Sequence, residues 1–201
     1  MVSDRLARQL EFLKEIDRLK SVVRRTALVD RSRLENSAEH SWHLAVMALV
    51  LAEHAPPDTD IAHVVRLLLV HDLVEIDAGD TFAYDPGGYR DKPARERAAA
   101  ERLFGLLPAD LGPEMRRWWE EFEAGDTAAA RFANALDRFS GLLQNWAGGD
   151  GGTWRQYRVT RRAVLARMEP IRMGAPLLWG LVERIVEEAT AAGHIIDDEG
   201  E

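Results

Sequence analysis

The segment H-D-L-V-E at residues 71–75 places groups capable of chemistry inside an otherwise apolar stretch. An ionised aspartate is costly there unless an opposite charge or a metal ion compensates it. Adjacent helical residues point about 100° apart, so His71 and Asp72 can share a metal only at the edge between them. Glu75 shares this face and can reach a water there without binding the metal itself. The segment therefore predicts a metal ion, held also by ligands from other helices.

The same segment has a simpler interpretation, which is a helix end whose charges meet solvent. An H-D pair alone does not decide between the two, but two other segments favour a site. The motif E-N-S-A-E-H-S, residues 35–41, places His40 in the first turn of another helix. The motif A-L-D, residues 135–137, places the acid Asp137 in the middle of a third apolar helix.

Together these motifs resemble those of the HD-domain metal-dependent phosphohydrolases. They are most similar to the 5′-deoxynucleotidase branch, whose members remove phosphate from deoxyribonucleoside monophosphates. The resemblance runs from about residue 19 to residue 146 and includes L-K at 19–20, R-T at 25–26 and G-D at 79–80. The longer motifs, E-N-x-A-E-H-S and H-D-x-x-E-I-x-x-G-D, are far more specific than H-D alone.

The resemblance implies one divalent metal bound by two imidazoles and two carboxylates, those of His40, His71, Asp72 and Asp137. It also implies that Glu75 orients and activates the attacking water. A mixed nitrogen and oxygen set suits Mn²⁺, Co²⁺, Zn²⁺, Fe²⁺ or Mg²⁺, and ligand chemistry alone does not choose among them. Such a site leaves positions for water and a phosphate oxygen, so we expect direct attack by water without a phosphoenzyme.

For the substrate, the resemblance places Arg25 near the phosphate and Asp80 near the sugar or the leaving group. A guanidinium group suits the first role because it binds phosphate oxygens in a bidentate manner. Thr26 stands where better-known bacterial members carry a tryptophan that contacts the sugar. The choice between deoxyribose and ribose is therefore open, and so is the choice of base.

The elements that must position these residues are predicted to be helices. Apolar residues recur at spacings of three and four over nearly every segment, which is the period of an amphipathic helix. The pattern predicts helices over about 6–19, 38–54 (capped by Ser37), 61–76, 94–107, 114–123, 127–146, 156–168 and 176–192. We therefore expect an all-α protein, a compact helical bundle of the HD-domain type. One domain would cover residues 1–201, with its core at about 19–146 and the helices of 156–192 packing on that core.

Composition narrows the class of protein. The net charge of −8 provides no basic surface for a nucleic acid polymer. Cysteine is absent, which excludes disulfides and thiolate ligands and suits a reducing cytoplasm. The longest apolar stretch, Val64 to Val74, contains Arg66, His71 and Asp72 and is too short to span a membrane. We expect a cytoplasmic protein whose partner is a small-molecule nucleotide.

Three functions compete. The first is a metal-dependent phosphomonoesterase that hydrolyses (deoxy)ribonucleoside 5′-monophosphates. The second is a phosphodiesterase or signalling-nucleotide hydrolase, whose two-metal forms carry additional histidines; His43 is the spare candidate, and we expect it to pack or to donate to a carboxylate behind the ligands. The third is a non-catalytic helical interaction protein, which the presence of Glu75 and of all four ligands disfavours.

Two further expectations concern packing. The resemblance implies a homodimer, because family members commonly form one. Trp118, Trp119 and Phe122 are spaced along a helix so that packing in the core or in a dimer contact is a better interpretation than a platform for a base.

Overall fold

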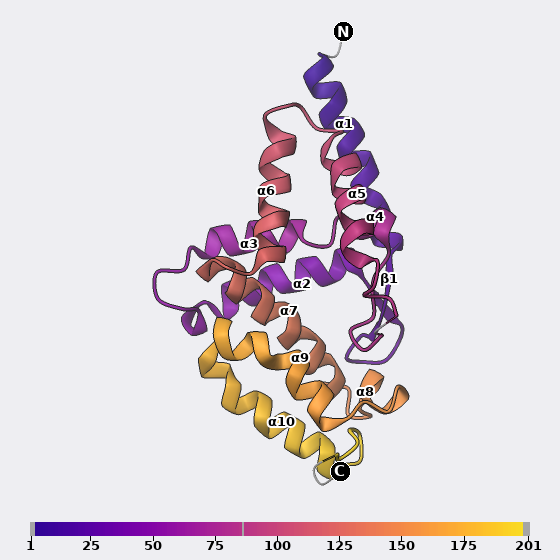
Figure 1. The fold of residues 1–201 in the computed structure, drawn as a ribbon, viewed down its shortest axis with the longest axis vertical. Coiled ribbons are helices and arrows are strands. Elements are labelled where there is room, and N and C mark those ends of the chain that lie inside the picture. Colours follow the sequence, from indigo (N-terminus) through magenta and orange to yellow (C-terminus); the bar gives the residue numbers. More distant parts are fainter. Residues whose placement is uncertain (1–2, 86, 199–201) are drawn as a thin grey trace.

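The computed structural model describes residues 3–85 and 87–198, most of which are helical (Figure 1). This confirms the predicted all-α class. The helices are α1 (Asp4–Ile16), α2 (Ser37–Val50), α3 (Ile61–Val70), α4 (Glu75–Ala78), α5 (Lys92–Phe104), α6 (Leu111–Ala124), α7 (Ala128–Ala147), α8 (Gly152–Gln156), α9 (Arg161–Gly174) and α10 (Trp179–Ala191). Shorter elements are the 3-10 helices η1 (Asp17–Ser21), η2 (Ala52–His54) and η3 (Pro176–Leu178) and the strands β1 (Val23–Ala27) and β2 (Leu34–Asn36).

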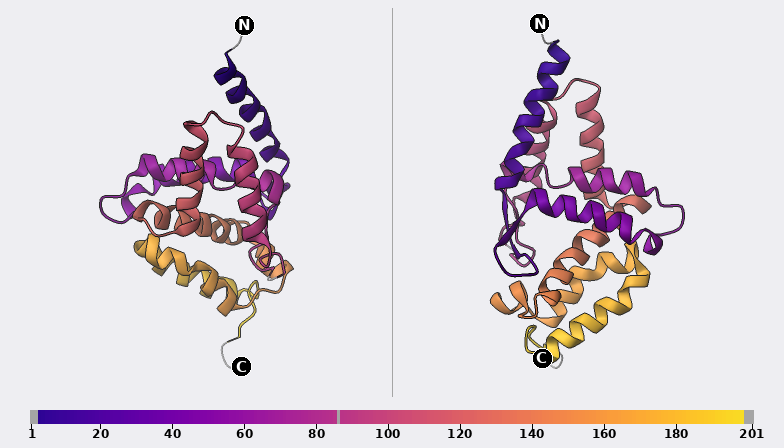
Figure 2. Two further views of the ribbon diagram at one scale, coloured as in Figure 1. Left: turned by 45° about the horizontal axis from the view of Figure 1, so that its top comes forward. Right: turned by 180° about the vertical axis from the view of Figure 1, so that it is seen from behind.

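The helices are arranged around α7. Helix α1 lies at one end of the molecule and α10 at the other, and α2 and α3 cross the middle side by side (Figure 2). Helix α7 packs against α2, α3, α6 and, most extensively, α9. None of the described helices is both long and apolar enough to cross a membrane.

Helix α7 supplies much of the core. Thr127 caps its start by accepting a hydrogen bond from the Ala130 amide. Its buried face includes Phe132, Leu136 and Leu142, which join side chains of α2, α3, α9 and α10 in the larger hydrophobic cluster. Burial of each such side chain contributes roughly 1.5–3 kcal/mol. This packing fixes the position of the site residues that α7 carries.

A second hydrophobic cluster lies where α5 meets α6 and η1, and it includes Leu103, Phe104 and Trp119. Phe122 is buried in the larger cluster, and Trp118 packs against both clusters from a partly buried position. The sequence predicted that these aromatic residues pack in the core or in a dimer contact, and the structure places them in or against the core.

The predicted helix over residues 61–76 is wrong at its end, and the difference shapes the site. Helix α3 stops at Val70, and the next residues form a turn before α4 begins at Glu75. In this turn the Leu73 amide donates to the Val70 carbonyl at 3.1 Å and the Glu75 amide to the Asp72 carbonyl at 3.0 Å. Three-residue bonding winds the chain more tightly than an α-helix does. The side chains of His71 and Asp72 converge here, whereas adjacent residues of a regular helix would diverge.

The hairpin of β1 and β2 was not expected from the helical periodicity. The strands are antiparallel, with Val23 opposite Asn36 and Ala27 opposite Leu34. Strands of this length carry too few alternating apolar residues to give a strand signal in the sequence. The hairpin matters because it directs Arg24 and Glu35 toward the site.

Other helix bounds differ locally. Helix α2 begins one residue early, because Asn36 rather than Ser37 is its cap and forms a capping box with Glu39. It ends at Val50, before the short η2. The region predicted as one helix over 156–168 is split between α8 and α9.

The close contact of α9 with α7 gives a test of the packing. A Cβ added to Gly174, the last residue of α9, would overlap the carbonyl oxygen of Arg131 on α7. We expect Gly174→Ala to destabilise the protein by about 1–3 kcal/mol, since the backbone must shift to relieve the overlap. Gly180→Ala is the matched control because nothing lies within 4 Å of the added atom, and we expect it to be neutral or slightly stabilising. Chemical denaturation measures both; equal stability of the two variants would contradict the packing.

Candidate active site

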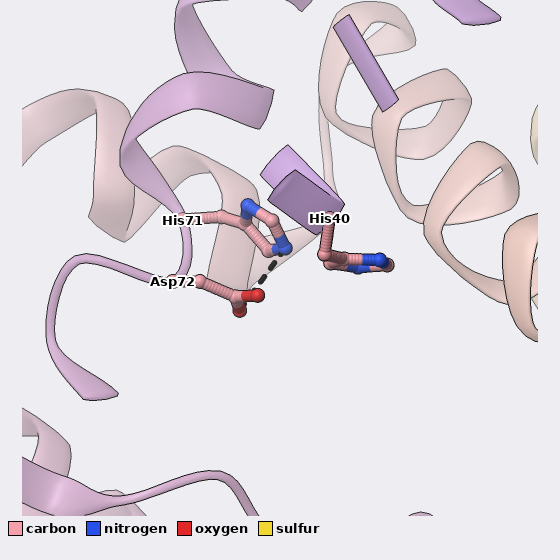
Figure 3. A group of neighbouring side chains, drawn as sticks. All are labelled: His40, His71 and Asp72. Atoms are coloured by element: carbon pink, nitrogen blue, oxygen red, sulfur yellow. Dashed lines mark ion pairs between the residues drawn. The ribbon is translucent and has the colours of Figure 1, made fainter. Parts of the chain in front are cut away.

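Three buried side chains, from α2 and from the turn after α3, lie next to one another (Figure 3). His40, His71 and Asp72 each present one ligand atom, and these atoms all lie within 4.8 Å of one another. Ligand bonds of about 2.0–2.2 Å would allow one ion to contact all three after small side-chain adjustments. The structure thus brings together three of the four predicted ligands in a cluster that can hold a metal.

The Nε2 atom of His71 is available to bind such an ion. Its Nδ1 donates a hydrogen bond to the Leu68 carbonyl at 2.8 Å, which leaves the lone pair of Nε2 free. Nε2 is buried without a hydrogen-bond partner and lies 3.0 Å from Oδ1 of Asp72. A buried polar atom without a partner is rare in folded proteins. A cation between this nitrogen and the carboxylate would satisfy both, so the residues fit a metal.

His40 lies among carboxylates. Its Nε2 is 3.0 Å from Oδ1 of Asp137, and its Nδ1 is 3.2 Å from Oε2 of Glu35. Burial and the charge of Arg24 act to lower the pKa of His40, but the two carboxylates outweigh them and raise it to about 9. The surroundings of His40 therefore favour a positive charge, which either a proton or a metal ion can supply.

Glu35 is a site residue that the sequence reasoning missed. It is buried at the end of the hairpin, and its Oε1 accepts a hydrogen bond of 2.7 Å from Nε2 of Gln144 on α7. Glu35 is therefore fixed on the side of His40 away from Asp137. A carboxylate in this position sets the orientation of a metal-binding histidine and makes it more basic. Its place as the first residue of the E-N-S-A-E-H motif is the signal that could have identified it.

Asp137, the fourth predicted ligand, contacts His40. It is not one of the three residues whose ligand atoms lie within 4.8 Å of one another. It bonds to His40 and also pairs with Arg138, the next residue of α7. Burial acts to raise the pKa of Asp137, but Arg138 and His40 outweigh it and hold the pKa well below the usual range. Asp137 is therefore an anion beside the other three residues.

Glu75 lies at the start of α4, within the same site. Its Oε2 accepts a hydrogen bond of 2.6 Å from the Ser37 hydroxyl at the start of α2. Burial, reinforced by the charge of Asp72, raises the pKa of Glu75 well above its ordinary value. A raised pKa makes a carboxylate a better proton acceptor near neutral pH. Position and chemistry both suit the predicted acid–base role.

Arg24, rather than its predicted neighbour Arg25, lies beside the cluster. Its Nη1 donates to Oδ2 of Asp72 at 3.1 Å, and the same nitrogen is 3.7 Å from Oδ1 of Asp80. Arg25 is exposed, bonds to the Tyr157 hydroxyl at 2.9 Å and lies 5.8 Å from the centre of the Phe82 ring. Successive residues of a strand point to opposite faces, which is why only one of the two arginines reaches the metal cluster.

Two adjoining cavities open at the site. The larger, of about 150 Å³, is lined by His71, Asp72 and Glu75. The smaller, of about 70 Å³, is lined by Arg25 and Thr26 among others. Both share a wall formed by Arg24, Asp80, Thr81, Asp137, Arg138 and Arg167. Burial raises the pKa of Asp80 in this wall in spite of Arg24. The predicted substrate residues Arg25, Thr26 and Asp80 thus all line space next to the cluster.

Two other histidines, His43 and His63, lie outside the cluster. His43 is not part of the metal-binding group, and its ring stacks near Trp42 with centroids 6.1 Å apart. His63, at the start of α3, pairs with Glu121 of α6 at 2.8 Å and is partly buried.

A comparison with known families and structures agrees with this geometry. A model of the HD domain matches residues 16–179. A solved structure of a "predicted metal-dependent phosphohydrolase" from Magnetospirillum magnetotacticum MS-1 is 49% identical, with a TM-score of 0.92 over 97% of this chain and 99% of that one. A conserved hypothetical protein from Pyrococcus furiosus, 20% identical, shares the fold with a TM-score of 0.61 over 88% of this chain and 98% of that one. The chain belongs to the HD-domain family.

Curated relatives narrow the class further. The chain is 40% identical over 147 residues to the 5′-deoxynucleotidase HDDC2 of Bos taurus, a match that covers 71% of this chain and 69% of the relative. It is 36% identical over 137 residues to the protein of the same name from Homo sapiens, covering 67% and 65%. The match thus spans about two thirds of the length of these relatives. The chain is an enzyme of the HD phosphohydrolase class.

The position of Glu35 gives a test of the metal site. We expect Glu35→Gln to weaken Mn²⁺ binding about 10- to 100-fold, because His40 loses the carboxylate that orients its ring. Isothermal titration calorimetry on the metal-depleted protein measures the affinity. Glu39→Gln is the matched control, since glutamine also completes the capping box of α2. Wild-type affinity in Glu35→Gln would contradict the role of this residue.

Proposed function

We propose that the protein is a metal-dependent phosphomonoesterase that hydrolyses (deoxy)ribonucleoside 5′-monophosphates to nucleoside and phosphate. The observation that carries the proposal is the buried cluster of His40, His71 and Asp72 with Glu75 beside it. Relatives named 5′-deoxynucleotidase support the substrate class. Among the described residues no second group of metal-binding geometry occurs, and this favours a monoesterase over the two-metal phosphodiesterases.

The proposed ligands of one divalent metal are His40, His71, Asp72 and Asp137. Such an ion would neutralise charge on the phosphoryl group and make a nearby water more acidic. Ligand chemistry leaves its identity open among Mn²⁺, Co²⁺, Zn²⁺, Fe²⁺ and Mg²⁺.

The protein's own groups carry the proton transfers. Glu75, oriented by the Ser37 hydroxyl, takes the proton of the attacking water as the bond to phosphorus forms. The bond from phosphorus to the 5′ oxygen breaks, and that oxygen needs a proton. Asp80 lines the same cavity with a raised pKa and is suited to provide it.

Recognition of the phosphate is assigned first to Arg24, because this guanidinium lies next to Asp72 and is only partly exposed. Arg25 and Thr26 line the smaller cavity, so their proposed role is to contact the nucleoside part of the substrate. The preference for deoxyribose over ribose then depends on this cavity.

We also propose a homodimer, in a cytoplasmic location that the cysteine-free sequence suits. Apolar side chains stand exposed at helical spacing on two elements. Leu6, Leu10 and Leu13 of α1 are 44%, 47% and 59% exposed, and Trp42 and Leu49 of α2 are 64% and 63% exposed. Exposed apolar patches of this kind commonly mark protein contacts.

The activity is tested with a panel of nucleoside 5′-monophosphates, with Mn²⁺ or Co²⁺, by measuring free phosphate. We expect release from the monoesters and none from bis(p-nitrophenyl) phosphate. Glu75→Gln should lower turnover about 10²–10⁴-fold while metal binding persists, whereas Asp72→Ala should lose both. Glu187→Gln, on the exposed face of α10, is the matched control. Hydrolysis of the diester alone would indicate a phosphodiesterase, and inactivity with every metal would indicate a non-catalytic protein.

The dimer is tested by light scattering after size-exclusion chromatography. We expect the wild type to show twice the mass of one chain. Leu49→Glu should dissociate it, because a charge would be buried in the apolar contact. Leu177→Glu is the control, since Leu177 is 73% exposed on η3 and belongs to neither α1 nor α2. A wild-type monomer, or dimers in both variants, would contradict this interface.

A further inference from the structure

An arginine in the middle of α9 faces the site without a carboxylate partner. Arg167 lines both cavities and is partly buried. Its Nη1 donates a hydrogen bond of 3.3 Å to the Tyr89 hydroxyl. Within residues 3–85 and 87–198, no carboxylate oxygen comes within 4.0 Å of its guanidinium group. A buried cation without a counter-ion is costly, so its presence requires an explanation.

The other cations of the larger cavity are all paired. Arg24 contacts Asp72 and Lys92 contacts Glu96, the latter at 2.9 Å. Arg138 contacts Asp137, yet its Nε is buried without a hydrogen-bond partner. A metal held by Asp137 would leave less negative charge beside Arg138 as well. Arg167 is therefore the cation of this cavity for which the described residues provide no carboxylate partner.

Arg138 and Arg167 are close enough to repel each other. Burial, and then the charge of Arg138, lower the pKa of Arg167. An arginine nevertheless stays charged in a protein. The charge of Asp137 offsets only part of these unfavourable effects on Arg167, so an anion in the cavity would stabilise it. Both side chains line the cavity that also contains His71 and Asp72. Its volume of about 150 Å³ is well above the roughly 10–15 Å³ that one water needs, which leaves space for a tetrahedral oxyanion.

We propose that Arg167, with Arg138, binds the phosphoryl group of the substrate and the phosphate product. This inference rests on the proposed phosphomonoesterase function and adds a binding residue from the C-terminal part of the chain. Two planar guanidinium groups can each donate two hydrogen bonds to phosphate oxygens. Tyr89 accepts a hydrogen bond from Arg167 and so holds its guanidinium group toward the cavity.

Binding of inorganic phosphate tests the inference without substrate turnover. Titration of the Mn²⁺-loaded protein with phosphate should give a dissociation constant about 10- to 100-fold higher in Arg167→Met than in wild type, because charged hydrogen bonds are lost. Phosphate should raise the melting temperature of the wild type but not that of Arg167→Met. In phosphate-free buffer, Arg167→Met should melt no lower than wild type, because it removes an unpaired buried charge.

Two further variants control the experiment. Arg184→Met makes the same change at an exposed position of α10 and should bind phosphate as the wild type does. Arg167→Lys keeps the charge without the planar donors, so it should fold and bind phosphate with intermediate affinity. Wild-type affinity in both Arg167 variants, or a lower melting temperature of Arg167→Met together with wild-type affinity, would show a structural role and overturn the inference.

Kinetics separate the inference from the proposed function. If nucleotides are hydrolysed, Arg167→Met should raise the KM and the inhibition constant of phosphate together. Unchanged values of both in an active enzyme would contradict the inference alone. Phosphate binding that depends on Arg167, in a protein that releases no phosphate from nucleotides, would contradict the proposed function alone.

Discussion

Several carboxylates are buried together where α2, α7 and the turn after α3 meet, and the rest of the site depends on how their charge is balanced. Asp72, Asp137 and Glu35 all lie within 3.2 Å of a histidine nitrogen. Removing charged groups from water costs several kcal/mol for each ion unless opposite charges compensate it. Arg24 supplies one compensating positive charge. The raised pKa of His40 indicates that a second positive charge is favoured among these carboxylates.

Several elements contribute charged side chains to this cluster, and each does so through its local structure. The tight turn after Val70 brings two adjacent side chains to one point. The hairpin brings a cation, Arg24, and an anion, Glu35, to the same place from the two short strands of its sheet. Helix α7 carries Asp137 at the edge of its buried face, where packing against α3 and α9 holds it.

Charge is also distributed across the adjoining cavity. Negative groups gather at the cluster itself, while Arg138 and Arg167 approach from α7 and α9. A substrate phosphate between a metal and these guanidinium groups would meet positive charge on both sides, which favours a group that gains negative charge during hydrolysis. Membership in the HD-domain family is consistent with this arrangement, because the match to the family model includes all of these elements.

The sequence by itself determined the helical class and the H-D-L-V-E and E-N-S-A-E-H-S motifs, because helical periodicity and motif spacing are local properties. Which imidazoles and carboxylates should meet was predicted only through the resemblance of these motifs to a known family. The tertiary structure alone decided that Arg24 and not Arg25 reaches the cluster, that Glu35 supports His40, and that Arg167 faces the same cavity. Arg24 and Asp72 are 48 positions apart, and no local pattern encodes such a contact. Whether a strand residue points inward, and which distant side chain it meets, depends on the packing of the helices around it.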